Sequence, residues 1–214
     1  MTATAHRLER LEDLSASVRP EHILRAHYPD LGPVVEEVRA TAAAMAVHAL
    51  ELASPVAWRR DVAIREVDGT RVELDGGAIF TSSALAAMLR GGSSVQMFLV
   101  TLGPRLDERV TELFNAMDGL EGLFLDTAGW VVVQSALSSV RRRLGERARA
   151  DGYRVTRRVG PGYLDWALEE APALVSALAA GTDLPGIEVL DSGAILPEKT
   201  ITGLYGLIPQ ATSN

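Results

Sequence analysis

Helical spacing of apolar residues is the most extensive pattern in this chain. Residues 34–53 carry apolar side chains three and four positions apart, and residues 120–150 do the same, apolar early and rich in arginine late. This period predicts two helices that each bury one face. Shorter helices are predicted where a proline or a capping serine precedes an apolar run, at 20–28, 84–90, 104–117 and 172–180.

Strand patterns fill the intervals between these helices. Residues 56–66 and 70–74 alternate in part and flank Asp68-Gly69, a dipeptide typical of a hairpin turn. Further strands are predicted over 78–80, 94–102, 153–159, 187–195 and 200–208. Strands and helices do not alternate as βαβ units. The order therefore predicts an α+β fold, a mostly antiparallel twisted sheet with flanking helices.

Length and composition limit the class of protein. The 214 residues, 47% of them hydrophobic, suffice for one full core, and we divide them into an N-terminal helical arm (1–33) and an α+β domain (34–214). The absence of cysteine excludes disulfides and thiolate metal sites and is compatible with a cytoplasmic protein. We find no secretory signal and no uninterrupted apolar run long enough to span a membrane.

Charge and histidine placement exclude further chemistries. A formal charge of −7 argues against nucleic acid as a partner. The four histidines lack metal-ligand spacing, so we expect no metal site. Arginines late in the long helix and just after it form a local exception to the acidic charge: Arg141, Arg142, Arg143, Arg147, Arg149, Arg154, Arg157 and Arg158. They are either a solvated helix end favoured by the helix dipole or a docking patch for an acidic protein.

One short stretch carries the chemistry of greatest interest: Arg158-Val159-Gly160-Pro161-Gly162-Tyr163-Leu164-Asp165-Trp166. Gly160 and Gly162 allow backbone to approach a ligand closely, and Pro161 stiffens the turn. Arg158 offers a planar fork of donors suited to a carboxylate, and Tyr163 adds a flat face with a polar tip. The pattern fits either a strand-ending turn with a solvated arginine or a site for a small anionic or zwitterionic ligand.

Two ordered blocks of sequence resemble one family. The turn and its continuation, Pro161-Gly162-Tyr163-Leu164-Asp165-Trp166-Ala167-Leu168-Glu169-Glu170, and a later block over 188–197 and 199–206 resemble the reactivation domain of cobalamin-dependent methionine synthase and its short stand-alone relatives. A weaker match covers 100–104. The resemblance is strongest from Arg158 to Gly206, and it implies the same α+β fold.

The resemblance also implies a ligand and its contacts. The family's domain binds S-adenosylmethionine and presents the methyl group to an oxidised cobalamin while a flavodoxin-type protein supplies an electron. By position, Arg158 would hold the methionine carboxylate, the backbone at Gly160 would contact the ligand, and Tyr163 would sit near the methyl group. Asp165 and Asp191 would support this site. Gln134 occupies the place of a family glutamate, and an amide pairs with an ammonium group more weakly than a carboxylate does.

Two hypotheses about function follow. In the first, the chain binds S-adenosylmethionine and helps to remethylate a cobalamin in trans, held by a corrinoid protein or a methionine synthase core. No residue here acts as acid, base or nucleophile, because the cofactor carries the chemistry. In the second, the chain is a non-catalytic interaction module that keeps the fold without the ligand. Gln134, and the lack of a later aromatic strand after Pro209, motivate the second hypothesis.

Overall fold

The computed structural model describes residues 7–210 as an α+β fold built on one large sheet. All strand pairs of this sheet are antiparallel, in the order β4-β3-β2-β5-β9-β6, and β1 also pairs with β2. The strands are β1 (Glu9–Leu11), β2 (Val56–Asp68), β3 (Arg71–Leu74), β4 (Ile79–Thr81), β5 (Ser94–Thr101), β6 (Tyr153–Val155) and β9 (Thr200–Pro209). A separate hairpin joins β7 (Glu188–Val189) to β8 (Ile195–Leu196).

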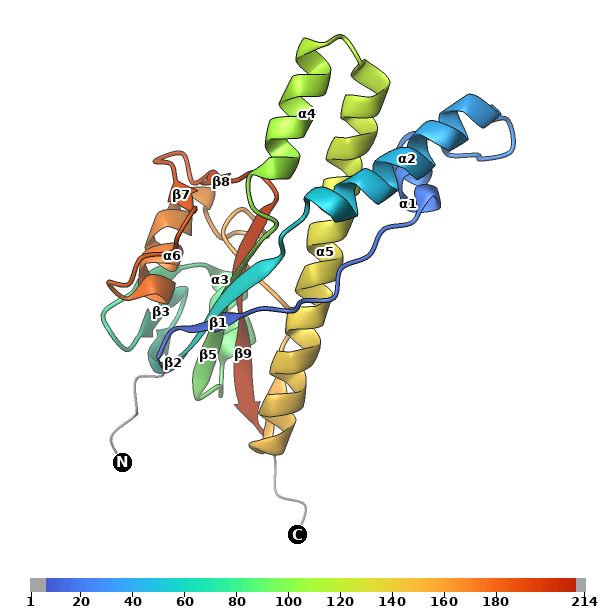
Figure 1. Cartoon of the computed structure of the whole chain (residues 1–214). Coiled ribbons are helices and arrows are strands. Elements are labelled where there is room, and N and C mark those ends of the chain that lie inside the picture. Colours follow the sequence, from blue (N-terminus) through green and yellow to red (C-terminus); the bar gives the residue numbers. More distant parts are fainter. Residues whose placement is uncertain (1–6, 211–214) are drawn as a thin grey trace.

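Helices cover both faces of the sheet (Figure 1). They are α1 (Pro20–His27), α2 (Glu36–Leu52), α3 (Ser83–Leu89), α4 (Arg105–Asn115), α5 (Gly119–Ala150) and α6 (Ala171–Ala179), with a short 3-10 helix η1 (Leu168–Glu170) before α6. The α-helices lie where apolar spacing, or a proline or serine before an apolar run, predicts them, whereas η1 was not predicted. Figure 1 shows α4 and the first turns of α5 projecting beyond the sheet as a helical hairpin.

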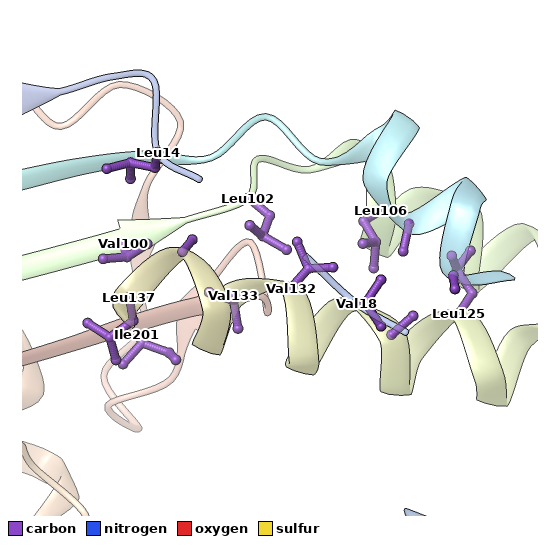
Figure 2. Close-up of a cluster of buried hydrophobic side chains, with 14 of the residues drawn as sticks. Leu14, Val18, Val100, Leu102, Leu106, Leu125, Val132, Val133, Leu137 and Ile201 are labelled. Carbon is purple, nitrogen blue, oxygen red and sulfur yellow. The ribbon is translucent and has the colours of Figure 1, made fainter. Parts of the chain in front are cut away.

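The core divides into two layers, one on each face of the sheet. Alternate side chains of the central strand β5 point to opposite faces, and nearly the whole strand is buried because helices cover both sides. Phe98 and Val100 pack with α1, α2, α4 and α5, whereas Met97 and Leu99 pack with α3 and α6. Figure 2 shows part of the first layer, with Val100, Val132, Val133 and Ile201 among its side chains.

The long helix α5 is the main helix of the first layer. By length and composition alone it is apolar enough to cross a membrane. We did not expect this from the sequence, in which we found no uninterrupted apolar run of that length. More than half of its most apolar window is buried inside the protein, as in the core helix of a globular domain. Its buried positions recur at helical spacing and include Phe124, Ala128, Val132 and Val140.

The segment assigned to an N-terminal arm contributes to the core of the rest. Leu14, Val18, Ile23 and Leu24 are buried in the first layer. Its polar stretch includes the strand β1, and Arg143 of α5 donates to the carbonyl oxygens of Glu12 and Asp13. Residues 1–6 lie outside the described part of the chain.

Two strand predictions were wrong in extent. The predicted strand 187–195 is instead a hairpin of two short strands around a turn at Gly193, which has a positive φ of 84°. The predicted strand 153–159 keeps regular pairing only over β6, although the chain stays beside β9 as far as Val159. That second departure decides where Arg158 lies.

Candidate functional site

Irregular pairing with β9 sets the position of Arg158. After β6, Thr156 N–H donates to the Gly206 carbonyl at 3.0 Å, and Gly206 N–H donates to Thr156 Oγ1 at 2.8 Å. Val159 and Leu204 then exchange two backbone hydrogen bonds of 3.1 and 2.8 Å. Val159 is buried in the layer of α3 and α6, so its neighbour Arg158 lies on the opposite, α5-facing side of the sheet.

The Arg158 guanidinium is only partly paired. Its Nη2 lies 3.4 Å from the Tyr163 hydroxyl, and its Cζ lies 5.1 Å from the centre of the Tyr163 ring. Its Nη1 is buried and has no hydrogen-bond partner in the protein. A buried guanidinium nitrogen without an acceptor is costly, and a carboxylate or phosphate oxygen is the group that best satisfies it.

Tyr205 connects Arg158 to helix α5. Burial of this side chain raises the pKa of the Tyr205 hydroxyl, while the positive charges of Arg158 and Arg141 oppose that rise. Both guanidinium groups therefore lie near the same hydroxyl. Gln134, Ser138 and Arg141 follow one another at positions i, i+4 and i+7, which places them on one exposed face of α5. We take that face together with the turn after Arg158 as the candidate site.

Sequence reasoning missed Tyr205. The alternation of β9 is the signal that points to it, because Ile201, Gly203 and Tyr205 share one face of the strand. Gln134 lies on α5 and is exposed.

The turn itself is closed by three backbone hydrogen bonds. Tyr163 N–H donates to the Gly160 carbonyl, Trp166 N–H donates to the Tyr163 carbonyl, and Gly162 N–H donates to the Trp166 carbonyl. Gly162 (φ 84°) and Leu164 (φ 58°) both adopt the left-handed conformation, which is strained for leucine. Pro161 is buried, whereas Tyr163 and Leu164 are 53% and 67% exposed. The turn thus presents an aromatic and an aliphatic side chain to the surface.

Gly160 has a packing reason to be glycine. A Cβ atom at this position would lie 2.9 Å from the Thr202 carbonyl oxygen and 3.3 Å from Gly203 Cα. The sequence suggested that Gly160 lets backbone approach a ligand, but this side of the residue faces the β9 backbone. The missing side chain allows the segment after β6 to press against β9.

Asp165 anchors the turn to helix α3. Its carboxylate accepts hydrogen bonds from the hydroxyls of Ser82 and Ser83 and from the backbone N–H groups of Ser83 and Ala84. These bonds, led by the Ser82 and Ser83 hydroxyls, hold the pKa of Asp165 well below its usual range. The two oxygens are engaged at the start of α3, so the geometry gives Asp165 a positioning role.

Trp166 and Glu170 fix the other side of the turn. The Trp166 ring is 1% exposed and packs edge-on against Phe80, with ring centres 5.1 Å apart. Its Nε1–H donates to Glu170 at 2.7 Å, and Glu170 also accepts from the Thr81 backbone N–H. Glu170, at the start of α6, therefore joins the turn to β4.

Asp191 lies on the β7–β8 hairpin and is exposed. The hairpin packs against the segment after the turn, since a Cβ at Gly193 would lie 2.4 Å from the Leu168 carbonyl oxygen. Within residues 7–210, the Asp191 side chain has no hydrogen bond or ion pair. The structure brings its hairpin against the continuation of the turn but joins Asp191 to none of the other candidate residues.

The arginines of the long helix separate into two groups. Arg143 and Arg147 bind the N-terminal segment, Arg147 through Glu9 at 3.2 Å. Arg141, Arg142, Arg149 and Arg154 line a groove of about 540 Å³ between α5 and β6. Ser138 and Arg141 of the exposed α5 face belong to this arginine groove, whereas Arg158 and Tyr163 do not line it. Glu146 is the acidic residue in its lining.

Lys199 forms a cluster that sequence reasoning did not anticipate. This buried lysine donates to Asp126 at 2.7 Å, lies 3.5 Å from Asp107, and has its Nζ 5.2 Å from the centre of the Trp130 ring. The cluster ties the start of β9 to α4 and α5. In residues 7–210, no group of three or more histidine, aspartate or glutamate side chains is arranged to hold a metal ion.

Comparison with known proteins identifies the fold. The chain is similar to the crystal structure of the MetH reactivation domain bound to AdoHcy, with a TM-score of 0.64 over 98% of this chain and 82% of that one. The two sequences are 14% identical, so the likeness establishes the shared fold alone. No protein-family model and no curated protein matches the chain. The predicted α+β fold and its resemblance to the methionine synthase reactivation domain are confirmed.

Proposed function

We propose that this chain binds S-adenosylmethionine on the surface between the Arg158–Leu164 turn and the exposed face of α5. The observation that carries the proposal is the Arg158 Nη1 atom, which is buried and has no hydrogen-bond partner in the protein. It belongs to a guanidinium group already oriented by Tyr163. The MetH reactivation domain, which has this fold, was crystallised with AdoHcy, the demethylated form of the same ligand.

Each element of the site has a proposed role. Arg158 pairs with the methionine carboxylate through its planar fork of donors. The Gly160-Pro161-Gly162 backbone and the exposed Tyr163 ring contact the ligand, and Tyr163 shields the methyl group from solvent. Gln134 offers its amide oxygen to the ligand ammonium. Asp165 holds the turn in place from α3, and Asp191 supports it from the neighbouring hairpin.

The protein contributes position rather than acid, base or nucleophilic chemistry. When bound, S-adenosylmethionine supplies a methyl group on a positively charged sulfur, for a cobalamin held by a corrinoid protein or a methionine synthase core. Arg158 and Tyr163 are pre-oriented by their mutual contact, and the anchored turn limits the conformational freedom lost on binding. The chain thus acts as the S-adenosylmethionine-binding partner in the reactivation of a corrinoid enzyme.

The arginine groove is the proposed contact for an acidic partner. Four arginines with a single glutamate give this end of α5 a positive surface on a chain whose formal charge is −7. A flavodoxin-type electron donor has the required acidic character. Such charge complementarity raises the association rate more than the affinity, so the association rate should fall steeply as salt is added.

Calorimetric titration with S-adenosylmethionine tests the proposal. Arg158→Ala is expected to weaken binding about 10- to 100-fold, the loss of a hydrogen bond to a charged group. Arg157→Ala is the matched control, since it removes the same charge from the adjacent exposed position and should leave the affinity within about twofold. Equal affinities for wild type and Arg158→Ala would contradict the assigned site.

A non-catalytic interaction module is the second candidate. The amide of Gln134 favours it, because an ammonium group gains less from an amide than from a carboxylate. Such a module would hold its corrinoid partner without S-adenosylmethionine. Co-purification in ligand-free buffer, together with undetectable binding of S-adenosylmethionine to the complex, would favour this candidate. The variant Gln134→Glu should then restore measurable binding.

A further inference from the structure

A second hollow lies on the α5-facing side of the sheet, away from the Arg158 turn. It measures about 370 Å³ and lies between the C-terminal end of α5 and strands β2, β5 and β9. Two rows of cross-strand neighbours, Asp61 beside Gln96 and Ala63 beside Ser94 and Leu207, form its floor. No residue of the 158–164 turn lines it.

The feature that points to a ligand is Gln96. This residue is 2% exposed, and its side-chain oxygen Oε1 has no hydrogen-bond partner in the protein. Gln96 is the polar residue in an otherwise apolar run of β5, from Val95 to Val100. A buried amide oxygen without a donor destabilises the folded protein, and a donor from outside the chain would remove that cost.

The charges around the cavity define the class of that donor. Arg147, one of its two cations, is already bound to Glu9, and Arg60 donates to the Ala177 carbonyl at 3.3 Å. The carboxylates are less satisfied: Asp61 meets Arg59 only at 3.4 Å, and Asp75 meets Arg65 at 3.6 Å. The lining therefore offers more incompletely paired hydrogen-bond acceptors than donors. Such a lining disfavours an anionic ligand and favours a cationic one that donates hydrogen bonds.

The lining also holds the polar residues Ser93, Ser94, Asp151 and Tyr153, together with four apolar side chains. Val62, Ala63, Ala148 and Leu207 are small or medium hydrocarbon side chains. They suit a short aliphatic body attached to the cationic head group.

We infer that this cavity is a second binding site, for a small aliphatic ammonium compound. Its N–H groups donate to Gln96 Oε1 and to the carboxylate of Asp61, the cross-strand neighbour on the same face. Its hydrocarbon body packs on Ala63, Ala148 and Leu207. The inference rests on the cavity alone and is independent of S-adenosylmethionine binding at Arg158.

Propylammonium is the probe, with 1-propanol as its uncharged counterpart of similar size. Isotope-labelled protein is titrated with each, and backbone amide shifts are followed by NMR at Asp61, Ser94, Gln96 and Ala148. We expect saturable shifts at these residues with propylammonium and at least tenfold weaker binding of 1-propanol. Equal responses to the two compounds, or no saturable response to propylammonium, would overturn the inference.

Two variants separate ligand binding from structural effects. Gln96→Met removes the acceptor while keeping length and volume, so it should raise the melting temperature of the free protein and weaken propylammonium binding at least tenfold. Asp61→Asn provides a second, independent loss of affinity should Gln96→Met fold poorly. Asn115→Leu, the similar amide-to-hydrocarbon change at an exposed position of α4, should bind as wild type.

A lower melting temperature for Gln96→Met would count against the inference, because it would mean that water already satisfies the amide. So would a high-resolution crystal structure that shows only ordered water at Gln96 with saturating propylammonium present. Loss of S-adenosylmethionine binding in Arg158→Ala, with unchanged propylammonium binding, would keep the two sites distinct.

Discussion

Replacing Gly160 with alanine is the sharpest test of how this fold builds its site. The added Cβ would lie 2.9 Å from the Thr202 carbonyl oxygen, about 0.5 Å inside an ordinary contact, and both groups that meet belong to backbone. The segment around Val159 must move off β9, which lengthens its two hydrogen bonds with Leu204. Overpacking of this kind costs about 1–3 kcal/mol.

An opposing effect makes the sign of the result informative. Alanine restricts the unfolded chain more than glycine does, which stabilises a protein by about 0.4–1 kcal/mol where the site tolerates it. We therefore expect Gly160→Ala to lower the free energy of unfolding by about 1–2 kcal/mol, measured by urea denaturation without ligand. Gly145→Ala is the control: its Cβ meets only Arg149 at 3.9 Å, and helix propensity predicts a gain of about 0.5–1 kcal/mol.

Affinity for S-adenosylmethionine supplies the second measurement on the same variant. Displacing Val159 moves Arg158, so binding should weaken together with stability. If Gly160→Ala is as stable as wild type but binds no ligand, then this glycine serves the ligand rather than the strand contact. That result would refute the packing argument.

Three further variants test the anchors of the turn and the buried lysine. Hydrogen bonding lowers the pKa of Asp165 from its ordinary value of 3.8, so the stability that its carboxylate contributes is present above pH 3.8 and is lost as the pH falls further. Asp165→Asn should therefore unfold in acid with a shallower pH dependence than wild type, as followed by circular dichroism. Trp166→Phe should cost about 2–4 kcal/mol in urea denaturation, since it removes the donor to Glu170 and opens a small cavity, whereas Trp130→Phe, at a 43% exposed position, should cost less than about 1 kcal/mol. Lys199→Met should cost about 1–3 kcal/mol, less than a fully buried pair because Asp126 is partly exposed; adding Asp126→Leu should recover part of that loss, and recovery of none would contradict the ion-pair account.

Local patterns in the sequence account for most of the fold. The hairpin turn at Asp68-Gly69, the Ser82 cap of α3 and the apolar spacing of α2 and α5 each predict an element that the structure contains. These features depend on residues a few positions apart, where propensity and periodicity act directly. Predictions failed where distant contacts prevail. Strand β1 pairs with β2 and is held there by the bond between Glu9 and Arg59, 50 positions apart. The polar sequence around Glu9 does not indicate this partner.

The site follows the same division. The segment after Arg158 was predicted to form a turn, and backbone hydrogen bonds close one over residues 160–166. Gly162 and Tyr163 are exposed there, whereas Gly160 is buried against β9. The role of Asp165 was not predictable, because its partner Ser82 is 83 positions earlier in the chain. Tyr205 was missed for the same reason, since its relation to Arg158 and Arg141 arises only when β9 is inserted between β5 and β6.

The buried position of Lys199 has a practical consequence. It is the only lysine in the sequence, whereas every other cationic side chain of the Lys and Arg type is an arginine. Because the Lys199 side chain is buried, reagents that acylate amines should reach its ε-amine only when β9 separates from α5. The rate of that modification, measured by mass spectrometry, would report the opening of this region without any introduced label. A partner or ligand that slows the modification of Lys199 would thereby be shown to stabilise the contact between β9 and α5.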